Sequence, residues 1–516
     1  MTIKNKKHKK TDLEKVTKLN ASKKETEYRH ENMTDNFKIE KLENIKKSGI
    51  DPYPSGVNRD YSCEEIKSDF EVLSVKEKLS IAGRIISVRE HGGSTFIDIE
   101  DGTGKLQVYF KKDKLGNKNY KFLTDNFGRG DFIEVNGVLF TTKRGEKSMI
   151  ANSYRLLSKA LIPIPEKWYG LKDFESRLRQ RYLDLMINSG TRDLFVERSR
   201  FIDSFRNYLK DDGFLEVETP VLENIPGGAE AEPFITHHNT LGIDLYLRIS
   251  LELHLKRLII GGFNKVFEIG KVFRNEGMSR EHLQEFTLLE FYRAYWDYNQ
   301  LMDFVEHMYK KIALKIFGKL KFEYEGTKLN FNQVWPRLKY KDVFEKYSGI
   351  DLGNVKTKED IMKEINKRKI SIEIEKEAGL GRIIDQVYKK IARPKLIGPL
   401  FIIDHPISVS PLAKEKRNDP GFVERFQILI MGSELGNGFS ELNDPIEQRK
   451  RFEDQAMLRE AGDKEAQMMD KDFIEALKYG MPPTAGFGVG LDRLFMILSG
   501  VSSVRETVLF PTMKPE

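Results

Sequence analysis

The chain has 516 residues, of which 39% are hydrophobic and 32% are charged. This length suggests about two to four domains and enough material for a large core. No apolar run approaches the roughly 20 residues of a membrane-spanning helix, and the basic N-terminus lacks the apolar core of a signal peptide. Because Cys63 is the sole cysteine, an internal disulfide and a thiolate zinc site are excluded. These features predict a cytoplasmic protein that does not contact a membrane.

The positive charge of the chain is concentrated at its N-terminus. Residues 1–47 contain 14 Lys and Arg against 8 Asp and Glu, a surplus of +6 out of a net charge of +7. The run from Lys4 to Lys10 shows no apolar periodicity, which is typical of a disordered segment. Two interpretations of this basic tail stay open: a solvated surface, or a clamp on a nucleic-acid backbone. Behind it, Phe37, Leu42 and Ile45 indicate a short amphipathic helix.

Short strands with alternating hydrophobicity dominate residues 76–160. Turns such as DGTG and KRGE separate five candidate strands: LSIAGRIISV, STFIDIE, KLQVYF, DFIEVNGVLF and SMIANSYRLL. Five short strands in this span are typical of an OB-type barrel, which commonly binds single-stranded nucleic acid. Arg89, Phe96 and Gln107 lie on or beside these strands and offer a cation, a stacking ring and an amide.

A linker and two helical segments follow the candidate barrel. Residues 161–190 begin with a proline-rich stretch and continue into a helix around Arg177 to Ile187. A longer amphipathic helix is expected from Phe195 to Leu209, and Gly213 offers a left-handed cap at its end. The segment FLEVETPVL is then predicted to form a strand that stops at Pro220, which cannot donate to a ladder.

The segment from Gly262 to Tyr295 has the pattern of a hairpin with a charged loop. A period of two places Arg274 and Glu276 on one face of the first strand. On the second strand it places Phe286, Leu288, Glu290 and Tyr292 together. Because unpaired buried charges are too costly for an ordinary core, this face is predicted to bind a ligand that bears phosphate, a flat ring and a cation.

The remaining sequence predicts a peripheral insertion and a second charged strand. Residues 321–396 carry mixed charged helices and are interpreted as an insertion that covers one edge of the main sheet. Strand patterns resume at Leu400, and in the segment SELGNGFSEL a period of two puts Asn437, Phe439 and Glu441 on one face. These residues are expected to add a further carboxylate to the ligand-binding face.

Several of these segments resemble motifs of the class II aminoacyl-tRNA synthetases. FRNEG followed by EFTLLE resembles motif 2, GFLEVETPVL resembles motif 1, and GFGVGLDRLFMIL resembles motif 3. RISLELHLKRL and ELGNGFSELNDP also match, and the resemblance is strongest to the lysine-specific members, from about Lys76 to Pro515. It implies an α+β fold, in which a class II antiparallel-sheet catalytic domain follows an N-terminal OB-fold β-barrel.

The resemblance also implies how the chain is divided. We expect a basic, partly disordered or helical tail over residues 1–47 and an anticodon-binding barrel over 48–160. A linker and hinge helix would cover 161–190. The catalytic domain would cover 191–516, with its peripheral insertion around 321–396.

The implied reaction is the ATP-dependent ligation of L-lysine to tRNA(Lys) through a lysyl-adenylate, with release of pyrophosphate and AMP. Such a reaction needs fixed cations and positioning more than a covalent nucleophile. Mg²⁺ is expected to accompany the ATP phosphates. The expected partners are ATP, L-lysine, tRNA(Lys) and a second copy of the chain, bound through motif 1.

By the same resemblance, individual residues are assigned to these ligands. Arg274 and Arg493 are expected to be catalytic, on the α- and γ-phosphates. The expected ATP-binding residues are Arg274, Glu276, His282, Phe286 and Arg493. The expected lysine-binding residues are Glu252, Glu290, Tyr292, Asn437, Phe439 and Glu441. The expected anticodon-binding residues are Arg89, Phe96 and Gln107. The expected metal ligands are Glu434 and Gln427.

The chain departs from the family pattern at several of these places. Gln427 stands where a glutamate is usual, so one charge is lost from the metal pair. Leu283 and Gln284 replace an Asn-Pro pair, and Glu281 stands where an arginine is common. Loss of the asparagine is expected to remove one adenine contact, and loss of the charge at Gln427 is expected to weaken metal binding.

Three other functions are weighed against lysine ligation. An aspartate or asparagine ligase shares the architecture, but an acidic side-chain pocket would repel aspartate. A catalytically inactive RNA-binding relative would not be expected to keep Arg274, Glu276 and Arg493. A ligase that lysylates a protein would lack the barrel. The glycines of GFGVG are not interpreted as a dinucleotide loop, because the surrounding βαβ pattern is missing.

Overall fold

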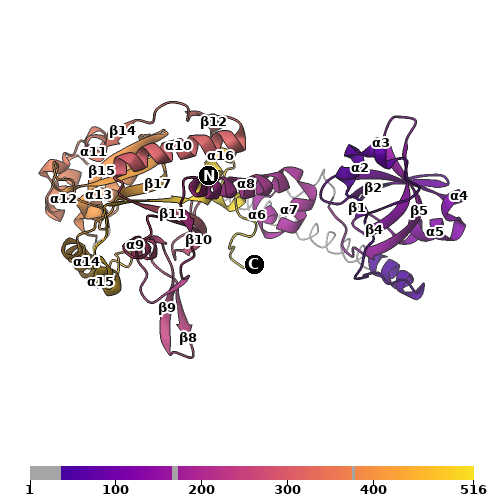
Figure 1. Ribbon diagram of the computed structural model, residues 1–516, viewed down its shortest axis with the longest axis horizontal. Helices are drawn as coiled ribbons and strands as arrows, with labels where there is room; N and C mark the ends of the chain where they lie inside the picture. The colour runs from indigo at the N-terminus through magenta and orange to yellow at the C-terminus, as the bar shows by residue number, and fades with distance from the viewer. Residues whose placement is uncertain (1–36, 166–172, 375–377, 516) are drawn as a thin grey trace, which may run out of the picture. The chain divides into compact units, whose positions relative to one another are not determined.

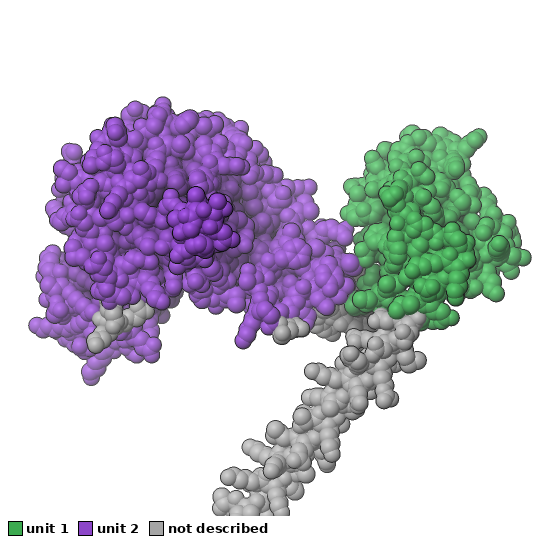
Figure 2. Space-filling model, turned by 90° about the horizontal axis from the view of Figure 1, so that it is seen from below, with its two compact units in different colours: residues 1–170 green, residues 171–516 purple. Residues whose placement is uncertain are grey.

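The computed structural model describes residues 37–165, 173–374 and 378–515. The chain divides into two compact units, residues 1–170 and residues 171–516, which Figure 2 colours separately. The run from Lys4 to Lys10, and with it most of the predicted basic tail, lies outside the described residues. Among the described helices, none is long and apolar enough to cross a membrane.

The first unit is built around a closed barrel with the strand order β1-β2-β3-β5-β4. Its strands are β1 (Leu79–His91), β2 (Ser94–Glu100), β3 (Lys105–Lys111), β4 (Phe132–Thr141) and β5 (Lys147–Ser158). Each corresponds to a candidate strand in the sequence, so the predicted OB-type barrel is confirmed. Alternate residues point inward, and the interior is filled by aliphatic side chains such as Ile81, Ile97 and Val108.

Short helices pack against the barrel and contribute side chains to its core. They are the helical residues 37–47, α2 (Cys63–Ser68), α3 (Phe70–Leu73), α4 (Lys112–Leu115) and α5 (Asn117–Asn126). The amphipathic helix predicted near Phe37 is present, and its Leu42 and Ile45 are buried. Phe37 itself is 57% exposed, and Ile45 is the residue of this helix that belongs to the barrel core.

The second unit contains an eight-stranded sheet with the order β14-β15-β16-β17-β18-β11-β10-β6. Its strands are β6 (Leu215–Glu216), β10 (Lys265–Phe273), β11 (Glu285–Ala294), β14 (Arg337–Lys339), β15 (Leu400–Pro406), β16 (Phe422–Ile430), β17 (Ser433–Ser440) and β18 (Thr484–Gly490). The six central strands are antiparallel, and the two edge strands, β14 and β6, pair in parallel with their neighbours.

Helices cover both faces of this sheet, with α10 above it and α9, α14 and α15 below it in Figure 1. The upper layer comprises α8 (Ser189–Asp211), α10 (Tyr298–Phe317) and α16 (Leu491–Ser499), and the lower layer comprises α9 (Glu252–Ile260), α14 (Pro445–Glu460) and α15 (Lys471–Leu477). Leu289 and Phe291 of β11 pack on the upper layer, whereas Leu288 and Tyr292 face the lower one. The predicted alternation along this strand is therefore present.

The peripheral insertion packs mostly in a small core at the β14 edge of the sheet, although Phe322 and Leu329 of its first hairpin join the main core. It contains β12 (Lys321–Tyr324), β13 (Thr327–Asn330), α11 (Tyr340–Ser348), α12 (Lys358–Lys367), α13 (Leu380–Val387) and a π-helical turn, η2 (Tyr388–Ala392). Apolar residues of these helices, including Phe344 and Ile383, pack with Ile402 of β15 and Leu429 of β16.

The helix before the sheet is interrupted. The sequence predicted one helix around Arg177 to Ile187, but α6 (Phe174–Arg179) and α7 (Arg181–Ile187) are separated at Gln180. Asp184 is fully buried and accepts hydrogen bonds from Arg177 Nε at 2.9 Å and Arg181 Nη1 at 2.8 Å. Both arginines therefore turn inward to one carboxylate.

Two predicted strands are shorter than expected. FLEVETPVL contributes only the two residues of β6 and then β7 (Leu222–Glu223), which joins β8 (Ile235–His238) and β9 (Ile243–Leu247) in a separate sheet. β10 ends at Phe273, so Arg274 and Glu276 lie in the following loop and not on a strand. The backbone N–H of Arg274 still donates to the carbonyl of Gln284 at 2.8 Å, but that of Asn275 donates to the carbonyl of Glu232 at 2.7 Å, outside the hairpin.

Gly137 in β4 allows a test of the barrel packing. A Cβ atom at this position would overlap the carbonyl oxygen of Ile150 on β5. Gly137→Ala is therefore expected to lower the free energy of unfolding of the barrel by about 1–3 kcal/mol. Denaturant unfolding monitored by circular dichroism measures this change. Gly128→Ala is the matched control, since nothing lies within 4 Å of a Cβ there; equal effects of the two changes would contradict the packing explanation.

Candidate functional site

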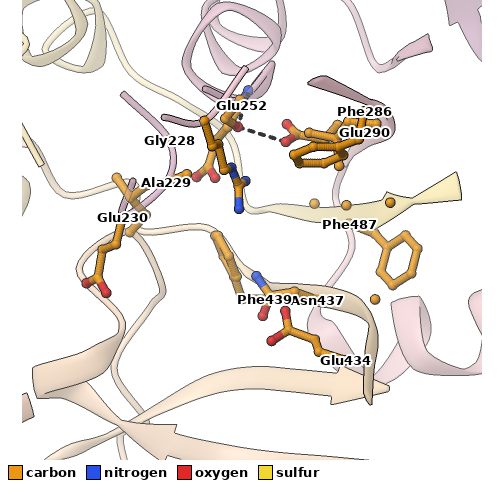
Figure 3. A pocket seen from close by; sticks show the side chains of 18 of the residues that line it. Gly228, Ala229, Glu230, Glu252, Phe286, Glu290, Glu434, Asn437, Phe439 and Phe487 are labelled. Atoms are coloured by element: carbon orange, nitrogen blue, oxygen red, sulfur yellow. Dashed lines mark hydrogen bonds between the residues drawn. The ribbon is translucent and has the colours of Figure 1, made fainter. Parts of the chain in front are cut away.

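A cavity of about 290 Å³ opens on the lower face of the sheet, over β11, β17 and β18. Figure 3 shows how the side chains of Glu252, Glu290, Phe286, Asn437 and Phe439 converge on it from separate segments. All the predicted ATP- and lysine-binding residues line the cavity except Glu441, and of the predicted metal pair Glu434 lines it but Gln427 does not. The structure thus brings together residues that are up to about half the chain apart.

The cavity has room because β18 presents glycines toward it. Gly490, Gly488 and Gly486 stand opposite Leu288, Glu290 and Tyr292 in the antiparallel register. A Cβ at Gly486 would overlap the Tyr292 ring and the Glu441 carboxylate. Sequence reasoning missed this role of the GFGVG segment, although glycines at alternate strand positions are a signal of close approach by another group.

Two arginines of the cavity are held by carbonyl oxygens and not by carboxylates. Arg274 donates from Nε and Nη2 to the carbonyl of Ile249, both at 3.3 Å, and lies 5.2 Å from the centre of the Phe286 ring. Arg493, near the start of α16, donates to the carbonyls of Glu281 at 3.2 Å and Glu434 at 3.1 Å. Because these acceptors are neutral, the positive charges stay available to an anionic ligand.

Glu276 and His282 lie at the exposed margin of the cavity. His282 Nδ1 is 2.7 Å from the hydroxyl of Ser279. Gln284, one of the departures from the family pattern, donates to the carbonyl of Glu276 at 3.2 Å. The amide of Gln284 thus braces the loop that carries Glu276.

A group of buried carboxyls forms another part of the wall. Glu290 accepts hydrogen bonds from Ser250 Oγ at 2.7 Å and from the Tyr292 hydroxyl at 3.2 Å. Burial, together with the neighbouring charge of Glu252, raises the pKa of Glu290 to about 7. Burial also raises the pKa of Tyr292 well above its usual range, so this phenol stays protonated.

Lys256 compensates part of this negative charge, and sequence reasoning missed it. Its side chain is fully buried, its Nζ lies 2.5 Å from Glu252 Oε1, and it also contacts Glu441. The structure thus supplies an internal cation beside the carboxyls assigned to lysine. The available signal was the i,i+4 spacing of Glu252 and Lys256 in ELHLK, which places both on one helix face.

Glu441 lies behind the cavity wall. It follows β17, is 1% exposed, and its Oε1 has no hydrogen-bond partner. It adjoins the position of Gly486, and Asn437 and Phe439 precede it on the strand. Asn437 is oriented by Arg425, which donates to its Oδ1 at 2.8 Å.

The two predicted metal ligands contact one another. Gln427 donates from Nε2 to Glu434 Oε2 at 2.9 Å, while its buried Oε1 has no hydrogen-bond partner. The described residues contain no group of three or more His, Cys, Asp or Glu side chains placed to hold a metal. Glu434 lines the cavity and fits a magnesium ion that takes its other ligands from water and phosphate, whereas Gln427 lies off the cavity and turns its amide nitrogen toward Glu434.

Glu281 also adds negative charge near these groups. Its carboxylate accepts from the hydroxyl of Ser433, with both oxygens at 2.8 Å. Ser433 precedes Glu434 on β17, so the departure at Glu281 ties the loop before β11 to the strand that carries the predicted metal ligand.

On the barrel, the predicted anticodon-binding residues lie on neighbouring strands. Phe96 stacks on Tyr109 with their ring centres 4.4 Å apart and an interplanar angle of 14°. Arg89 donates to the two oxygens of Asp98 at 2.8 and 3.0 Å. Gln107 Oε1 accepts from Ser148 Oγ at 3.1 Å. Tyr109 was missed, although the alternation in KLQVYF places it on the same face as Gln107.

Known proteins match both units. Residues 173–514 match the family described as class II tRNA synthetases (D, K and N), and residues 79–157 match the OB-fold nucleic acid binding domain. The lysine–tRNA ligase of Moorella thermoacetica is 47% identical over 93% of this chain and 97% of its own length. Those of Pelotomaculum thermopropionicum and Thermoanaerobacter pseudethanolicus are 46% and 48% identical, each over 92% of this chain and over 94% and 95% of their own lengths.

A glycine-floored cavity on an antiparallel sheet, together with these matches, defines a class II aminoacyl-tRNA synthetase. Within this class the chain belongs to the lysine–tRNA ligases. The predicted fold class and family are therefore confirmed.

Proposed function

We propose that this cavity joins L-lysine to the α-phosphate of ATP and then transfers it to tRNA(Lys). One observation carries the proposal: a single cavity is lined by two arginines with an aromatic ring and by buried carboxyls. Phe286 and Glu290 are four positions apart on β11, which is about 13 Å along a strand. This separation suits a nucleotide at one end and an amino-acid side chain at the other.

The ATP end would act through fixed donors. Arg274 offers a planar fork to the α-phosphate, and Arg493 offers a second one to the γ-phosphate. Phe286 would carry the adenine ring, with Glu276 at its edge and His282 on the phosphate tail. In the first step the lysine carboxylate forms a bond to the α-phosphorus and pyrophosphate leaves. The two arginines would stabilise the charge that spreads over the phosphorus oxygens.

The lysine end would bind two ammonium groups. Glu252 would take the α-amino group, while Glu290, Tyr292 and Glu441 would belong to the ε-amino end, with Asn437 and Phe439 along the side chain. Glu441 would close this end from behind Gly486. An acidic side-chain pocket disfavours aspartate, which the matched family also includes.

Magnesium would be held by Glu434, with Gln427 as its second protein ligand once the amide turns its oxygen toward the ion. When bound, this ion would neutralise charge on the phosphates. Gln427 brings no charge of its own, so Glu434 and the phosphates would dominate the affinity.

The first unit would bind the anticodon, and the assembly would be a cytoplasmic homodimer. The domain limits predicted from the sequence are proposed unchanged, with the basic tail as an additional contact to tRNA. Support for a dimer through motif 1 comes from its exposed apolar side chains: Leu215, Val221 and Leu222 are 47%, 42% and 46% exposed. Exposed apolar residues gathered in one segment are typical of an interface.

Arg274→Ala tests the ATP end. Truncation leaves charge on the α-phosphate uncompensated in the transition state, and loss of one such group costs about 100-fold or more. We expect lysine-dependent ATP–pyrophosphate exchange to fall by this factor, while thermal unfolding stays close to the parent. Arg449→Ala, an exposed arginine on α14, is the control. Exchange within about tenfold of the parent in Arg274→Ala would refute the assignment.

The raised pKa of Glu290 leads to a predicted pH dependence of lysine binding. Its proton must leave before the carboxylate can pair with an ammonium group, and burial raises its pKa to about 7. The KM for lysine in the exchange assay should therefore fall by up to about tenfold per pH unit as pH rises toward about 7, and then level off. Glu290→Gln should raise KM and abolish this slope. A parent KM that is flat from about pH 6 to 7 contradicts the role of Glu290.

Phe96 and Gln107 should affect tRNA in different ways. Stacking is worth about 1–3 kcal/mol per base and tolerates any base, so Phe96→Ala should weaken tRNA binding for every anticodon. Hydrogen bonds to the base edge supply selectivity, so Gln107→Ala should mainly erode preference for a central uridine over cytidine. Aminoacylation of tRNA transcripts with either uridine or cytidine at the centre of the anticodon measures both effects. ATP–pyrophosphate exchange without tRNA is the control and should not change in either variant. If both variants prefer uridine over cytidine as strongly as the parent does, the barrel recognises tRNA through other residues.

A further inference from the structure

Lys256 occupies a position beneath the cavity that the proposed reaction does not use. It lies on α9, one turn after Glu252, and is 0% exposed. Its ammonium contacts Glu252 and Glu441 and lies 5.3 Å and 5.8 Å from the ring centres of Phe439 and Phe473. One cation therefore connects a carboxylate of the cavity wall with a carboxylate behind it.

Burial of this cation is costly unless its partners are fixed. Burial lowers the pKa of Lys256, but Glu252 and Glu441 raise it by more, so the ammonium stays charged. Burial raises the pKa of both carboxyls, that of Glu441 well above its usual range, and Lys256 opposes this shift without cancelling it. Deleting the cation would leave two buried carboxyls with no direct positive partner from α9.

Other charged groups face this cluster from each neighbouring element. Glu290 and Tyr292 approach from β11, and the positive charge of Arg425 on β16 acts on Glu252. On α9 itself, Arg257 turns away and pairs with Asp470 at 2.6 Å, before α15. Lys256 is the cation in direct contact with both carboxylates.

A charge count over the three carboxyls and Lys256 shows what the internal cation contributes. If Glu252, Glu290 and Glu441 are all ionised, these four groups carry a charge of about −2, whereas the three carboxylates without Lys256 carry about −3. A diammonium amino acid brings two positive charges to this group. Arg425 acts on Glu252 and Arg274 interacts with Glu290 from outside it.

We propose that Lys256 is a positioning residue for substrate recognition, which holds Glu252 and Glu441 in place and favours their ionised forms. This inference rests on the proposed assignment of the lysine end of the cavity. Lys256 touches neither the nucleotide end nor the reacting carboxylate, so its loss acts on the KM for lysine and not on the KM for ATP.

The test compares Lys256→Met and Lys256→Gln with Lys256→Arg in the full-length protein. ATP–pyrophosphate exchange is measured against lysine and ATP from about pH 6 to 9. In both neutral variants the KM for lysine at about pH 7 should rise at least tenfold, and the pH at which it levels off should move upward by one unit or more. Lys256→Arg keeps the charge, so its KM for lysine should level off at the same pH as in the parent. The KM for ATP should change less than about threefold.

A merely structural role predicts a different result, because loss of packing does not move a pH profile. Lys159→Met is the matched control, since Lys159 is also a buried lysine, paired with Asp131 at 2.7 Å in the barrel. It should leave exchange and its pH profile unchanged. The inference is overturned if the KM for lysine of the neutral variants levels off at the same pH as in the parent. It is also overturned if Lys256→Arg moves this pH as far as the neutral variants do. If Lys256→Met does not fold, Lys256→Gln decides.

Glu441→Gln separates this inference from the assignment beneath it. If Glu441→Gln leaves the KM for lysine at the parental value, Glu441 does not serve the lysine end and the proposed pocket is wrong. If Glu441→Gln raises this KM while the neutral variants of Lys256 keep the parental profile, the pocket stands and the role of Lys256 is wrong.

Discussion

The whole site depends on the absence of side chains along one face of β18. Three glycines alternate there, opposite Leu288, Glu290 and Tyr292 of β11. Any Cβ at Gly486 would occupy the space of the Tyr292 ring and the Glu441 carboxylate. Because interiors are packed to the density of organic crystals, a cavity on a central sheet persists only where the backbone itself makes the floor.

The charged side chains around this cavity fall into two groups of opposite sign. On one part of the cavity, Arg274 and Arg493 are held by backbone carbonyls, which orient a guanidinium without neutralising it. On another, carboxyls are crowded together and are stabilised by Lys256 and hydrogen-bonding hydroxyls. A ligand with phosphates and ammonium groups meets the opposite charge at each place, which is how electrostatic complementarity produces specificity.

The barrel carries its proposed ligand-binding groups on an outer face and not in a cavity. Its interior is closed and aliphatic, and the partly exposed face of β2 and β3 carries the stacked pair Phe96 and Tyr109 beside Gln107 and Arg89. Arg89 donates to Asp98, and Ser148 donates to Gln107, so these polar groups are held in defined orientations. A preorganised aromatic platform with polar edges is what single-stranded RNA recognition requires.

The sequence by itself determined the barrel, the alternation along β11 and the family, because periodicity and motif order are local properties of the chain. Most of the residues that it assigned to ATP and lysine do line the cavity, although many other lining residues were not named. Only the tertiary structure decided three further points. β10 ends at Phe273, and the backbone N–H of Asn275 bonds to the carbonyl of Glu232 in a distant segment. Glu441 lies behind the wall and not on it, and Lys256 joins it to Glu252. These outcomes depend on which segments meet across the fold, and a periodic pattern carries no information about contacts at long range.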